Sequence, residues 1–383
     1  MRIGIDARMY RKSSAGIGRY IQNLIKNLFK IDKDNQYVLF MTAEDREEFE
    51  KLEIKNSLQI ANCKLKIVTV DIPHYSLSEQ TKLGPIIARE KLDLMHFTNF
   101  NHPIRYKGQF VTTIHDLTLF FFPETARRTN LIKRFGYRMV MKAACENSTK
   151  IIAVSESTKK DIIKTFHLPP EKIQVIYEAA DDKIFKKPSL QDIDKLRKKY
   201  RLLPKVILTV GQWRSHKNLI GLVKAYELIR RKMGANLIIL GQEDPEYLEL
   251  KAAIDNSPYK RDIIRPGFVS DEELSAWYHL ASVFVFPSFY EGFGLPGLEA
   301  MQVGAPVAAS RAGSLPEIFE DAAYYFNPHS PQEMAQEILK ILINDKIKAE
   351  QVARGFQIAK KYSWRKTAEE TLKLYKQIIK SKS

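Results

Sequence analysis

Short apolar runs recur along this chain. Between them lie longer stretches in which an apolar residue occurs every three or four positions. The runs are rich in Val, Ile and Phe and predict buried strands. The three-to-four-residue periodicity of the longer stretches predicts amphipathic helices. Regular alternation of the two predicts parallel sheets built from strand–helix–strand units. The predicted strands are Arg2–Ala7, Tyr37–Met41, Lys66–Val70, Leu94–Phe97, Phe110–His115, Lys150–Val154, Lys172–Tyr177, Val206–Val210, Asn236–Leu240, Ile263–Arg265, Val283–Pro287 and Pro306–Ala309.

The strands form two series, which predicts an α/β protein with two doubly wound domains. The break begins near Lys186–Ser189 and ends by Leu203–Pro204, with a charged helix predicted between them. We expect a first domain over residues 1–185, a linker over 186–204, a second domain over 205–362 and a final amphipathic helix over 363–383. Predicted helices include Ile17–Phe29, Asp192–Tyr200, Lys217–Met233, Asp271–Ala281 and Ser363–Ile379.

Composition agrees with a globular protein of this size. The chain has 383 residues, of which 44% are hydrophobic and 28% charged, enough for two cores. The N-terminus starts at once with a strand, and no apolar run approaches the roughly 20 residues that span a bilayer. Cys63 and Cys145 form neither a disulfide framework nor a metal pattern. We expect a cytoplasmic protein, with peripheral attachment to the inner membrane face as an option.

Net charge adds one local feature. The chain carries 61 basic and 45 acidic residues, so its net charge is +16. Residues 101–150 hold nine basic and three acidic residues, an excess of +6. Such a zone suits anionic lipid, a phosphorylated substrate or nucleic acid, and a merely soluble basic surface is a serious alternative.

The most informative motif lies after the predicted strand Val283–Pro287. Glu291 and Glu299 stand eight positions apart and enclose a glycine-rich loop followed by Pro296. Proline suits the first turn of a helix, and the free N–H groups and positive dipole at such a turn suit an anion or sugar hydroxyls. A simple strand–turn–helix with two solvated glutamates is the alternative, which the enclosed Gly-Phe-Gly-Leu-Pro sequence disfavours.

This motif resembles the donor site of glycosyltransferase family 4, and the resemblance extends over nearly the whole chain. It implies the GT-B architecture, in which two Rossmann-like domains face a cleft and a last helix crosses back to the first domain. It also implies a retaining, metal-independent transfer from a nucleotide-diphosphate sugar, with no cofactor. Glu299 would bind the donor ribose, and Glu291 would hold the sugar and diphosphate together with Gly292, Phe293, Gly294 and Leu295.

A second glycine motif follows the first predicted strand. Gly16 and Gly18 precede a helix, where glycine lets backbone approach a ligand closely. Residue 21 is Ile, so the dinucleotide fingerprint is incomplete and a dehydrogenase is disfavoured. The family resemblance places Gly16 or Gly18 beside the donor phosphate or the acceptor.

His115 and Asp116 end the predicted strand Phe110–His115. Ligands of open α/β sheets bind beyond the carboxyl ends of strands, although an isolated His is more often a buried, hydrogen-bonded one. The dipeptide resembles the family's His-Asp, which implies that His115 contacts the transferred sugar through a hydroxyl or through its own backbone carbonyl. Asp116 would either orient that histidine or bind the acceptor.

The apolar run Leu117–Pro123 and the basic residues after it have two interpretations. Aromatic side chains beside Arg and Lys can dock on an anionic membrane surface, or the phenylalanines can pack inside the first domain. The basic residues in question are Arg127, Arg128, Lys133, Arg134, Arg138 and Lys142.

Arg214 and Lys217 follow the first strand of the second domain. Departure of a diphosphate needs its charge neutralised, and cations at a strand-to-helix turn supply this without a metal. Lys217 resembles the family's diphosphate-binding lysine. Several relatives carry Arg immediately before it, whereas this chain has His216, so Arg214 is the candidate substitute.

Three weaker features complete the set. Ser155 reads first as a helix N-cap, although the family has a similar serine on the acceptor side. Val269 precedes the predicted N-cap Ser270, and in the family backbone at this position contacts the nucleobase. Asp32-Lys33-Asp34 could bind a metal in other glycosyltransferases, but after a helix it predicts a solvated turn.

We therefore predict a retaining glycosyltransferase with an acceptor-binding first domain and a donor-binding second domain. GDP-mannose is the first expectation for the donor, UDP-sugars are the alternative, and the acceptor would be a saccharide or a lipid-linked one. Rivals are an epimerase or phosphorylase of the same fold, a basic nucleic-acid-binding protein and a scaffold. No base-stacking motif supports nucleic acid as the partner, and Glu291, Glu299 and Lys217 argue against a scaffold.

Overall fold

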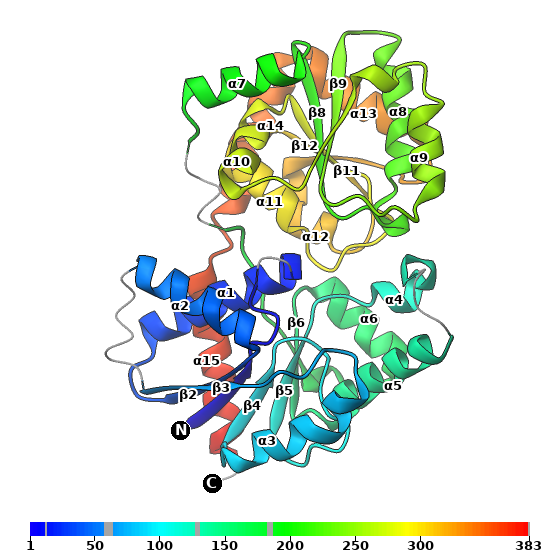
Figure 1. Cartoon of the computed structure of the whole chain (residues 1–383). Coiled ribbons are helices and arrows are strands. Elements are labelled where there is room, and N and C mark those ends of the chain that lie inside the picture. Colours follow the sequence, from blue (N-terminus) through cyan, green and yellow to red (C-terminus); the bar gives the residue numbers. More distant parts are fainter. Residues whose placement is uncertain (12–13, 57–63, 127–130, 182–186, 382–383) are drawn as a thin grey trace. The chain divides into compact units, whose positions relative to one another are not determined.

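The chain divides into two compact units, each built on one parallel sheet with helices packed on it (Figure 1). A computed structural model describes residues 1–11, 14–56, 64–126, 131–181 and 187–381. Unit 1 comprises Met1–Leu117, Arg128–Glu178 and Ser363–Ser383, and unit 2 comprises Thr118–Arg127 and Ala179–Tyr362. The predicted α/β class with two doubly wound domains is confirmed.

Unit 1 has a seven-stranded sheet in the order β3-β2-β1-β4-β5-β6-β7, and every neighbouring pair is parallel. Every residue of its strands β4 and β5 is buried, so these strands show no alternation of buried and exposed positions. Its elements are β1 Arg2–Asp6, α1 Ala15–Ile31, β2 Gln36–Met41, α2 Ala43–Asn56, β3 Lys64–Thr69, a π-helical turn Glu79–Leu83, α3 Gly84–Arg89, β4 Leu94–Phe97, β5 Phe110–Ile114, α5 Leu131–Asn147, β6 Lys150–Ala153, α6 Glu156–Phe166, a 3-10 turn Pro170–Lys172, β7 Ile173–Val175 and α15 Trp364–Lys380.

The final helix α15 packs against α1, so the end of the chain completes the first unit (Figure 1). Tyr375 on α15 lies fully buried, with its hydroxyl 2.5 Å from Nδ1 of His96 on β4. Trp364 at the start of α15 meets the ring of Tyr20 edge-on at 5.9 Å between centroids. The expected return of the last helix to the first domain is confirmed.

Unit 2 has a six-stranded parallel sheet in the order β10-β9-β8-β11-β12-β13. Helices α8 and α13 bury their apolar faces against it in one core that includes Leu222, Tyr226 and Ile338. The elements grouped with it are α4 Thr118–Phe121, a 3-10 turn Pro123–Ala126, α7 Leu190–Tyr200, β8 Lys205–Val210, a 3-10 turn Ser215–Lys217, α8 Leu219–Arg230, β9 Ala235–Leu240, α9 Leu248–Asp255, a 3-10 turn Lys260–Asp262, β10 Ile263–Gly267, α10 Asp271–Leu280, β11 Val283–Phe286, α11 Leu295–Gln302, β12 Val307–Ser310, α12 Leu315–Phe319, a 3-10 turn Glu320–Ala322, β13 Ala323–Phe326, α13 Pro331–Ile343 and α14 Asp345–Ala359.

Two elements of unit 2 differ from the prediction. Strand β13 was not predicted, because this short edge strand has two half-exposed tyrosines and no clear apolar pattern. The helix predicted from Lys217 begins instead at Leu219, since Asn218 adopts a left-handed conformation with φ of 52°. Lys217 therefore lies in the 3-10 turn Ser215–Lys217, before α8 begins.

The helix expected between the domains is present as α7. Ser189 caps it by accepting a hydrogen bond from the backbone N–H of Asp192 at 3.1 Å. Tyr200 at its end packs on Trp277 of α10 with 5.3 Å between ring centroids. Helix α7 thus packs on unit 2.

The turn at Asp32-Lys33-Asp34 was predicted to be solvated, which is wrong for Asp32. The residue is buried rather than solvated, and its carboxylate accepts hydrogen bonds from the Tyr37 hydroxyl at 2.5 Å and the Asn35 amide at 2.6 Å. Burial alone would raise the pKa of Asp32, but these donors lower it below its ordinary value. The carboxylate ties α1 to β2 and so has a structural role.

Candidate active site

Lys217 and Glu291 form the central ion pair of unit 2, at the carboxyl edge of β8 and β11. Lys217 Nζ lies 2.7 Å from Glu291 Oε1, and the Ser288 hydroxyl donates to the same oxygen at 2.5 Å. Both charged side chains are largely buried, at 20% and 12% exposure. Lys217 also lies over the ring of Phe286, 5.7 Å from its centroid. Strands β8 and β11 pair directly, so the fold brings the two predicted residues together.

The backbone of Glu291 is held by the segment that leads into α12. The Ser314 N–H donates to the Glu291 carbonyl at 3.1 Å, and the Ser314 hydroxyl shares its one proton between that carbonyl at 3.1 Å and the Phe293 carbonyl at 2.8 Å. A Cβ on Gly313 would stand 2.5 Å from the Glu291 carbonyl oxygen and 2.7 Å from its nitrogen. Gly313 and Ser314 were missed because nothing in the sequence shows that they touch a loop about 20 residues earlier.

The glycine loop ends at the N-terminus of α11, as predicted. Gly294, with φ of 120°, stands at the N-cap position, and Leu295 and Pro296 begin the helix. Phe293 is buried and meets the ring of Tyr362 edge-on at 5.7 Å. The first turn of α11, next to Gly292 and Glu291, thus has the helix geometry that favours an anion.

Glu299 points into the interior of unit 2 and is 1% exposed. The Tyr278 hydroxyl on α10 donates to its Oε2 at 2.8 Å. Tyr278 is itself fully buried. A buried carboxylate held by a tyrosine is an oriented acceptor, a geometry that also suits hydroxyl groups of a ligand. Tyr278 is a second residue that the sequence analysis missed.

His216 contributes no positive charge to the turn between β8 and α8. Burial, together with the charges of Lys217 and Arg214, lowers its pKa to about 2, so the ring is neutral. Its Nδ1 is buried without a hydrogen-bond partner among the described residues. Arg214 lies 3.4 Å from Asp244 with its side chain 40% exposed. Lys217 and Arg214 are therefore the cations of this turn.

Val269 lies between β10 and α10, next to a strongly exposed Phe268. Ser270 caps α10 by accepting from the Glu273 N–H at 3.2 Å, which confirms the predicted N-cap. This segment follows the same carboxyl edge of the sheet as the Lys217 turn, because β10, β9 and β8 are parallel neighbours.

His115 lies at the carboxyl end of β5 in unit 1. Its Nδ1 is 2.8 Å from Glu178 Oε1, and its Nε2 is 2.9 Å from the Thr98 carbonyl oxygen. The ring of Tyr20 meets it edge-on at 4.8 Å. Asp116 follows it in the chain and is partly buried. Glu178, two residues after the buried Ile176, was not singled out in the sequence.

The two glycines of the first loop have different surroundings. A Cβ on Gly18 would clash with the Arg11 carbonyl oxygen, so this glycine is required by the packing of the protein itself. A Cβ on Gly16 would meet nothing within 4 Å. Gly16, exposed in the first turn of α1, is thus the one of the two around which a ligand has room.

Ser155 is fully buried and caps α6. Its hydroxyl oxygen accepts from the Thr158 N–H at 3.0 Å, which confirms the N-cap interpretation. Its predicted place on the acceptor side stays a prediction.

The aromatic run after His115 was expected either to dock on a membrane or to pack inside the first domain, and two of its rings do not follow the second expectation. Phe121 meets Tyr290 edge-on at 5.2 Å between centroids, and Phe122 stacks on Phe289 at 6.3 Å. Their partners Phe289 and Tyr290 come just before Glu291 and belong to unit 2, so the Phe121 and Phe122 rings do not pack inside the first domain. Arg127 and Arg128 lie outside the described residues.

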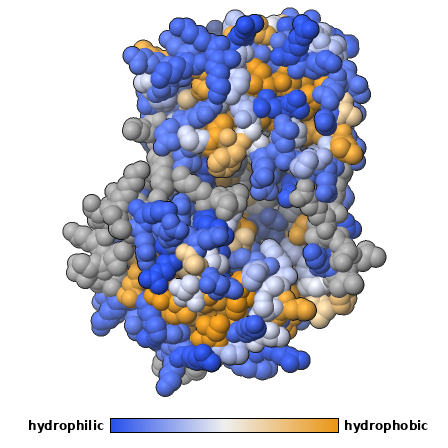
Figure 2. Space-filling model, in the orientation of Figure 1, coloured by the Kyte–Doolittle hydropathy of each residue, from blue (hydrophilic) through white to orange (hydrophobic). Residues whose placement is uncertain are grey.

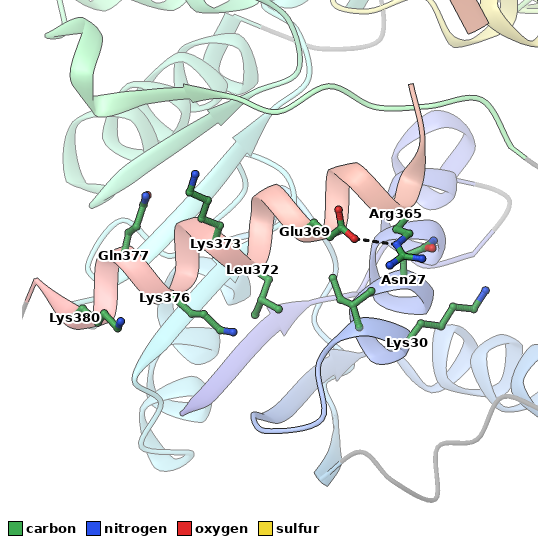
Figure 3. Close-up of a pocket in the computed structure, with 10 residues that line it drawn as sticks. Asn27, Lys30, Arg365, Glu369, Leu372, Lys373, Lys376, Gln377 and Lys380 are labelled. Carbon is green, nitrogen blue, oxygen red and sulfur yellow. Dashed lines mark hydrogen bonds and ion pairs between the residues drawn. The ribbon is translucent and has the colours of Figure 1, made fainter. Parts of the chain in front are cut away.

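A separate groove lies between α1 and α15 of unit 1 (Figure 3). It has a volume of about 830 Å³. Figure 3 shows basic side chains along α15 with Glu369 paired to Arg365 at 2.9 Å. None of the predicted site residues lines it. Its lining consists of Asn27, Lys30, Ile31, Arg365, Glu369, Leu372, Lys373, Lys376, Gln377 and Lys380.

The part of the chain that the structure describes has neither a membrane-spanning helix nor a metal-binding cluster. Within them, no helix is long and apolar enough to cross a membrane. In the same part of the chain, no group of three or more His, Cys, Asp or Glu residues is placed to hold a metal ion.

Two parallel-sheet units, one carrying a basic turn beside a glycine loop and a helix N-terminus, define a GT-B glycosyltransferase. A family model described as "Glycosyl transferases group 1" matches residues 192–357, and one described as "Glycosyltransferase Family 4" matches residues 14–183. The chain belongs to glycosyltransferase family 4.

Among curated proteins, the O-antigen chain mannosyltransferase B of Escherichia coli is 29% identical over 368 residues, covering 94% of this chain and 96% of that protein. The serotype-specific mannosyltransferase WbdA of Escherichia coli is 32% identical over 246 residues. That match covers 62% of this chain and 30% of WbdA.

Solved structures share the fold at low sequence identity. Sucrose-phosphate synthase from Thermosynechococcus elongatus has a TM-score of 0.77 at 19% identity, with 100% of both chains covered. Anabaena HepE in complex with UDP-glucose has a TM-score of 0.76 at 18% identity, covering 98% of this chain and 100% of that one. At these identities the likeness concerns the fold alone.

Proposed function

We propose that this glycosyltransferase moves mannose, with retention of anomeric configuration, from a nucleotide-diphosphate sugar to a saccharide or lipid-linked acceptor. The observation that carries the proposal is the Lys217–Glu291 pair beside the N-terminus of α11. Lys217 neutralises the departing diphosphate, and the N–H groups of Phe293, Gly294 and Leu295 bind its oxygens. Glu299, oriented by Tyr278, accepts hydrogen bonds from the donor ribose.

The donor sugar is inferred from relatives. The O-antigen chain mannosyltransferase B and WbdA are both mannosyltransferases by name, which supports mannose. HepE binds UDP and UDP-glucose, which supports a nucleotide sugar as the class of donor. GDP-mannose is the donor we test first.

The reaction needs no metal in this proposal. The two cations of the β8 turn and the dipole of α11 supply the positive charge that a metal provides in other transferases. The leaving diphosphate takes the proton of the acceptor hydroxyl as the new glycosidic bond forms, so no dedicated base is required. The glycine loop holds the diphosphate in place during that transfer.

An anionic membrane surface is the proposed partner that brings a lipid-linked acceptor close, at the inner face of the membrane. Phe135 and Met139, four residues apart on α5, are exposed at 66% and 48%. Lys133, Arg138 and Lys142 are exposed on the same helix. Apolar and basic side chains on one helix are the combination that docks in a lipid interface. Figure 2 shows that apolar patches interrupt the otherwise hydrophilic visible face.

Calorimetric titration tests the donor assignment. The wild type should bind one of GDP-mannose, UDP-glucose and UDP-N-acetylglucosamine, and Lys217→Met and Glu299→Gln should weaken that binding at least about tenfold. Glu350→Gln, a change on the exposed surface of α14, is the matched control. Equal affinity of all variants for the donor would reject the assigned site, and conversion of the donor without an acceptor would favour the epimerase alternative.

Vesicle sedimentation tests the membrane surface. Phosphatidylcholine vesicles with and without phosphatidylglycerol are mixed with wild type, with Phe135→Ser/Met139→Ser, and with Lys373→Gln/Lys376→Gln/Lys380→Gln. The proposal expects binding only to anionic vesicles, lost in the α5 variant and kept in the α15 variant. Loss in the α15 variant alone would move the docking surface to the groove of Figure 3.

A further inference from the structure

The ring of His115 is hydrogen-bonded at both nitrogens to groups that accept. Nδ1 faces Glu178 Oε1 at 2.8 Å, and Nε2 faces the Thr98 carbonyl oxygen at 2.9 Å. A neutral imidazole has one N–H and can donate only once, whereas an imidazolium donates twice. A carbonyl oxygen never donates, so Nε2 carries a proton. The second proton lies between Nδ1 and Glu178.

The surroundings of the ring favour placing that proton on the histidine. Glu178 comes from the segment after β7, Asp116 from the chain next to the ring, Tyr20 from α1 and His96 from β4. Burial alone would lower the pKa of His115, but the hydrogen bond and charge of Glu178 raise it above its ordinary value, aided by Thr98 and Asp116.

The neighbouring titratable groups leave the positive charge on this one ring. Burial and the His115 charge lower the pKa of His96 to about 3, so His96 is neutral. Its nitrogens face the Tyr375 hydroxyl at 2.5 Å and the Thr113 hydroxyl at 2.8 Å. Burial raises the pKa of Tyr20, whose hydroxyl lies 3.0 Å from the Thr113 hydroxyl. Neither group competes for the proton.

We propose that Glu178 is a positioning residue that holds His115 in the imidazolium form, fixed in orientation at the carboxyl end of β5. The ring then neither takes the proton of the acceptor nor offers a ring nitrogen to the sugar. Of the two contacts that the family resemblance implied, this leaves the one through the His115 backbone carbonyl. The functional part of this proposal rests on the glycosyl transfer proposed above.

Several elements fix the ring in place. The Thr98 hydroxyl donates to the Asp6 carbonyl at 2.6 Å, which ties the accepting segment after β4 to β1. The Tyr20 ring closes one side from α1. Glu178 is 4% exposed, so water competes little for its carboxylate. An ion pair with so little solvent holds both its charge and its geometry.

Glu178→Gln removes the negative charge at this position and keeps the size and shape of the side chain. Its amide oxygen can still accept from Nδ1, but the negative charge is gone, so the pKa of His115 falls. The protonated ring then persists only at lower pH, and whatever depends on it is lost as the pH rises. Glu171→Gln, an exposed carboxylate of the same unit, is the matched control.

Nitrogen NMR of the histidine rings tests the protonation state without any substrate. The chain has eight histidines, and His115→Gln assigns the signal. Wild type should keep both His115 nitrogens protonated to higher pH than Glu178→Gln, whose ring should lose its second proton first as the pH rises. An unprotonated Nδ1 in the wild type, with the proton on Glu178, would overturn the proposal. If a variant fails to fold, the wild-type spectrum still decides, because the doubly protonated ring differs from the neutral His96, His102 and His216.

The pH profile of kcat/KM tests the functional part. Glu178→Gln should lie within about threefold of wild type at the acid end and fall about tenfold or more toward the alkaline end. Glu171→Gln should follow wild type throughout. A loss in Glu178→Gln that is equal at all pH values would show a merely structural role. Absence of transfer by the wild type itself would reject the proposed function and leave the NMR result intact.

Discussion

Gly313 lies directly against the backbone of Glu291, closer than any residue with a Cβ could come. A Cβ at this position would be 2.5 Å from the Glu291 carbonyl oxygen, and Ser314 donates two hydrogen bonds to that same oxygen. The segment before α12 thus packs against the loop after β11 and fixes its backbone. The position of the Glu291 carboxylate, and of its partner Lys217, follows from this contact.

Gly313→Ala should displace the Glu291 loop and lower kcat/KM about 10- to 100-fold, since a shift of about 1 Å in a catalytic group has effects of that size. Its φ of 55° adds strain for alanine. Steady-state kinetics with the identified donor measures the loss. Gly234→Ala in the same unit, where a Cβ meets nothing within 4 Å, should keep normal activity. An unchanged Gly313→Ala would show that the loop tolerates displacement.

Lys217→Met should lower kcat about 100- to 1,000-fold, because it removes the cation that balances the leaving group. Glu291→Gln should also be impaired, and the double variant should lose less than the sum of the two effects, since the residues are in contact. Single-turnover kinetics of all three variants measures the coupling. Arg230→Met, which breaks a partly exposed pair with Asp262, is the control and should remain active. Simple additivity would mean that the ion pair does not act as a unit.

Tyr278→Phe should weaken donor binding about tenfold, because the buried Glu299 carboxylate loses a hydrogen-bond donor worth about 1.5 to 3 kcal/mol. Calorimetry measures the change in Kd. Tyr226→Phe removes a comparable buried hydroxyl, which donates to the Ala235 carbonyl at 2.8 Å away from the Glu299 helix. It should reduce stability and leave Kd unchanged. If both variants had the same Kd for the donor, Glu299 would not be part of the donor-binding site.

Acid should destabilise this protein through buried neutral histidines. Burial lowers the pKa of His96 to about 3 and of His102 to about 4, while unfolded histidine titrates near about 6.5. Below about pH 6.5 the unfolded chain binds protons that the folded chain does not, so each residue costs about 1.4 kcal/mol per pH unit as the pH falls. His115, whose pKa is raised, has the opposite sign and loses its stabilising contribution only as the pH rises through its folded value.

Scanning calorimetry between about pH 7 and pH 4.5 checks this sign. His102→Phe should make the midpoint of unfolding depend less on pH than in the wild type. His167→Asn is the control, because His167 is exposed in a left-handed conformation that Asn tolerates. A pH dependence that His102→Phe leaves unchanged would contradict the assignment of His102 as a buried neutral ring.

Much of the fold could be predicted because its signals are local. Buried parallel strands need unbroken apolar runs and their helices need apolar spacing, so Val283–Phe286 and Asp271–Leu280 were recognisable from the sequence. Strand β13 was not, because its pairing with β12, rather than its own pattern, makes it a strand. The helix after Lys217 began later than predicted because a left-handed Asn218 intervenes.

The sequence by itself determined the α/β class, the two sheets and the motif from Glu291 to Glu299, since each depends on residues close together in the chain. Only the tertiary structure decided that Gly313 supports Glu291, that Glu178 holds His115 and that His216 is neutral. The reason is physical. Charge state and position depend on burial and on partners far away in sequence, and these exist only once the sheets have brought their strand ends together.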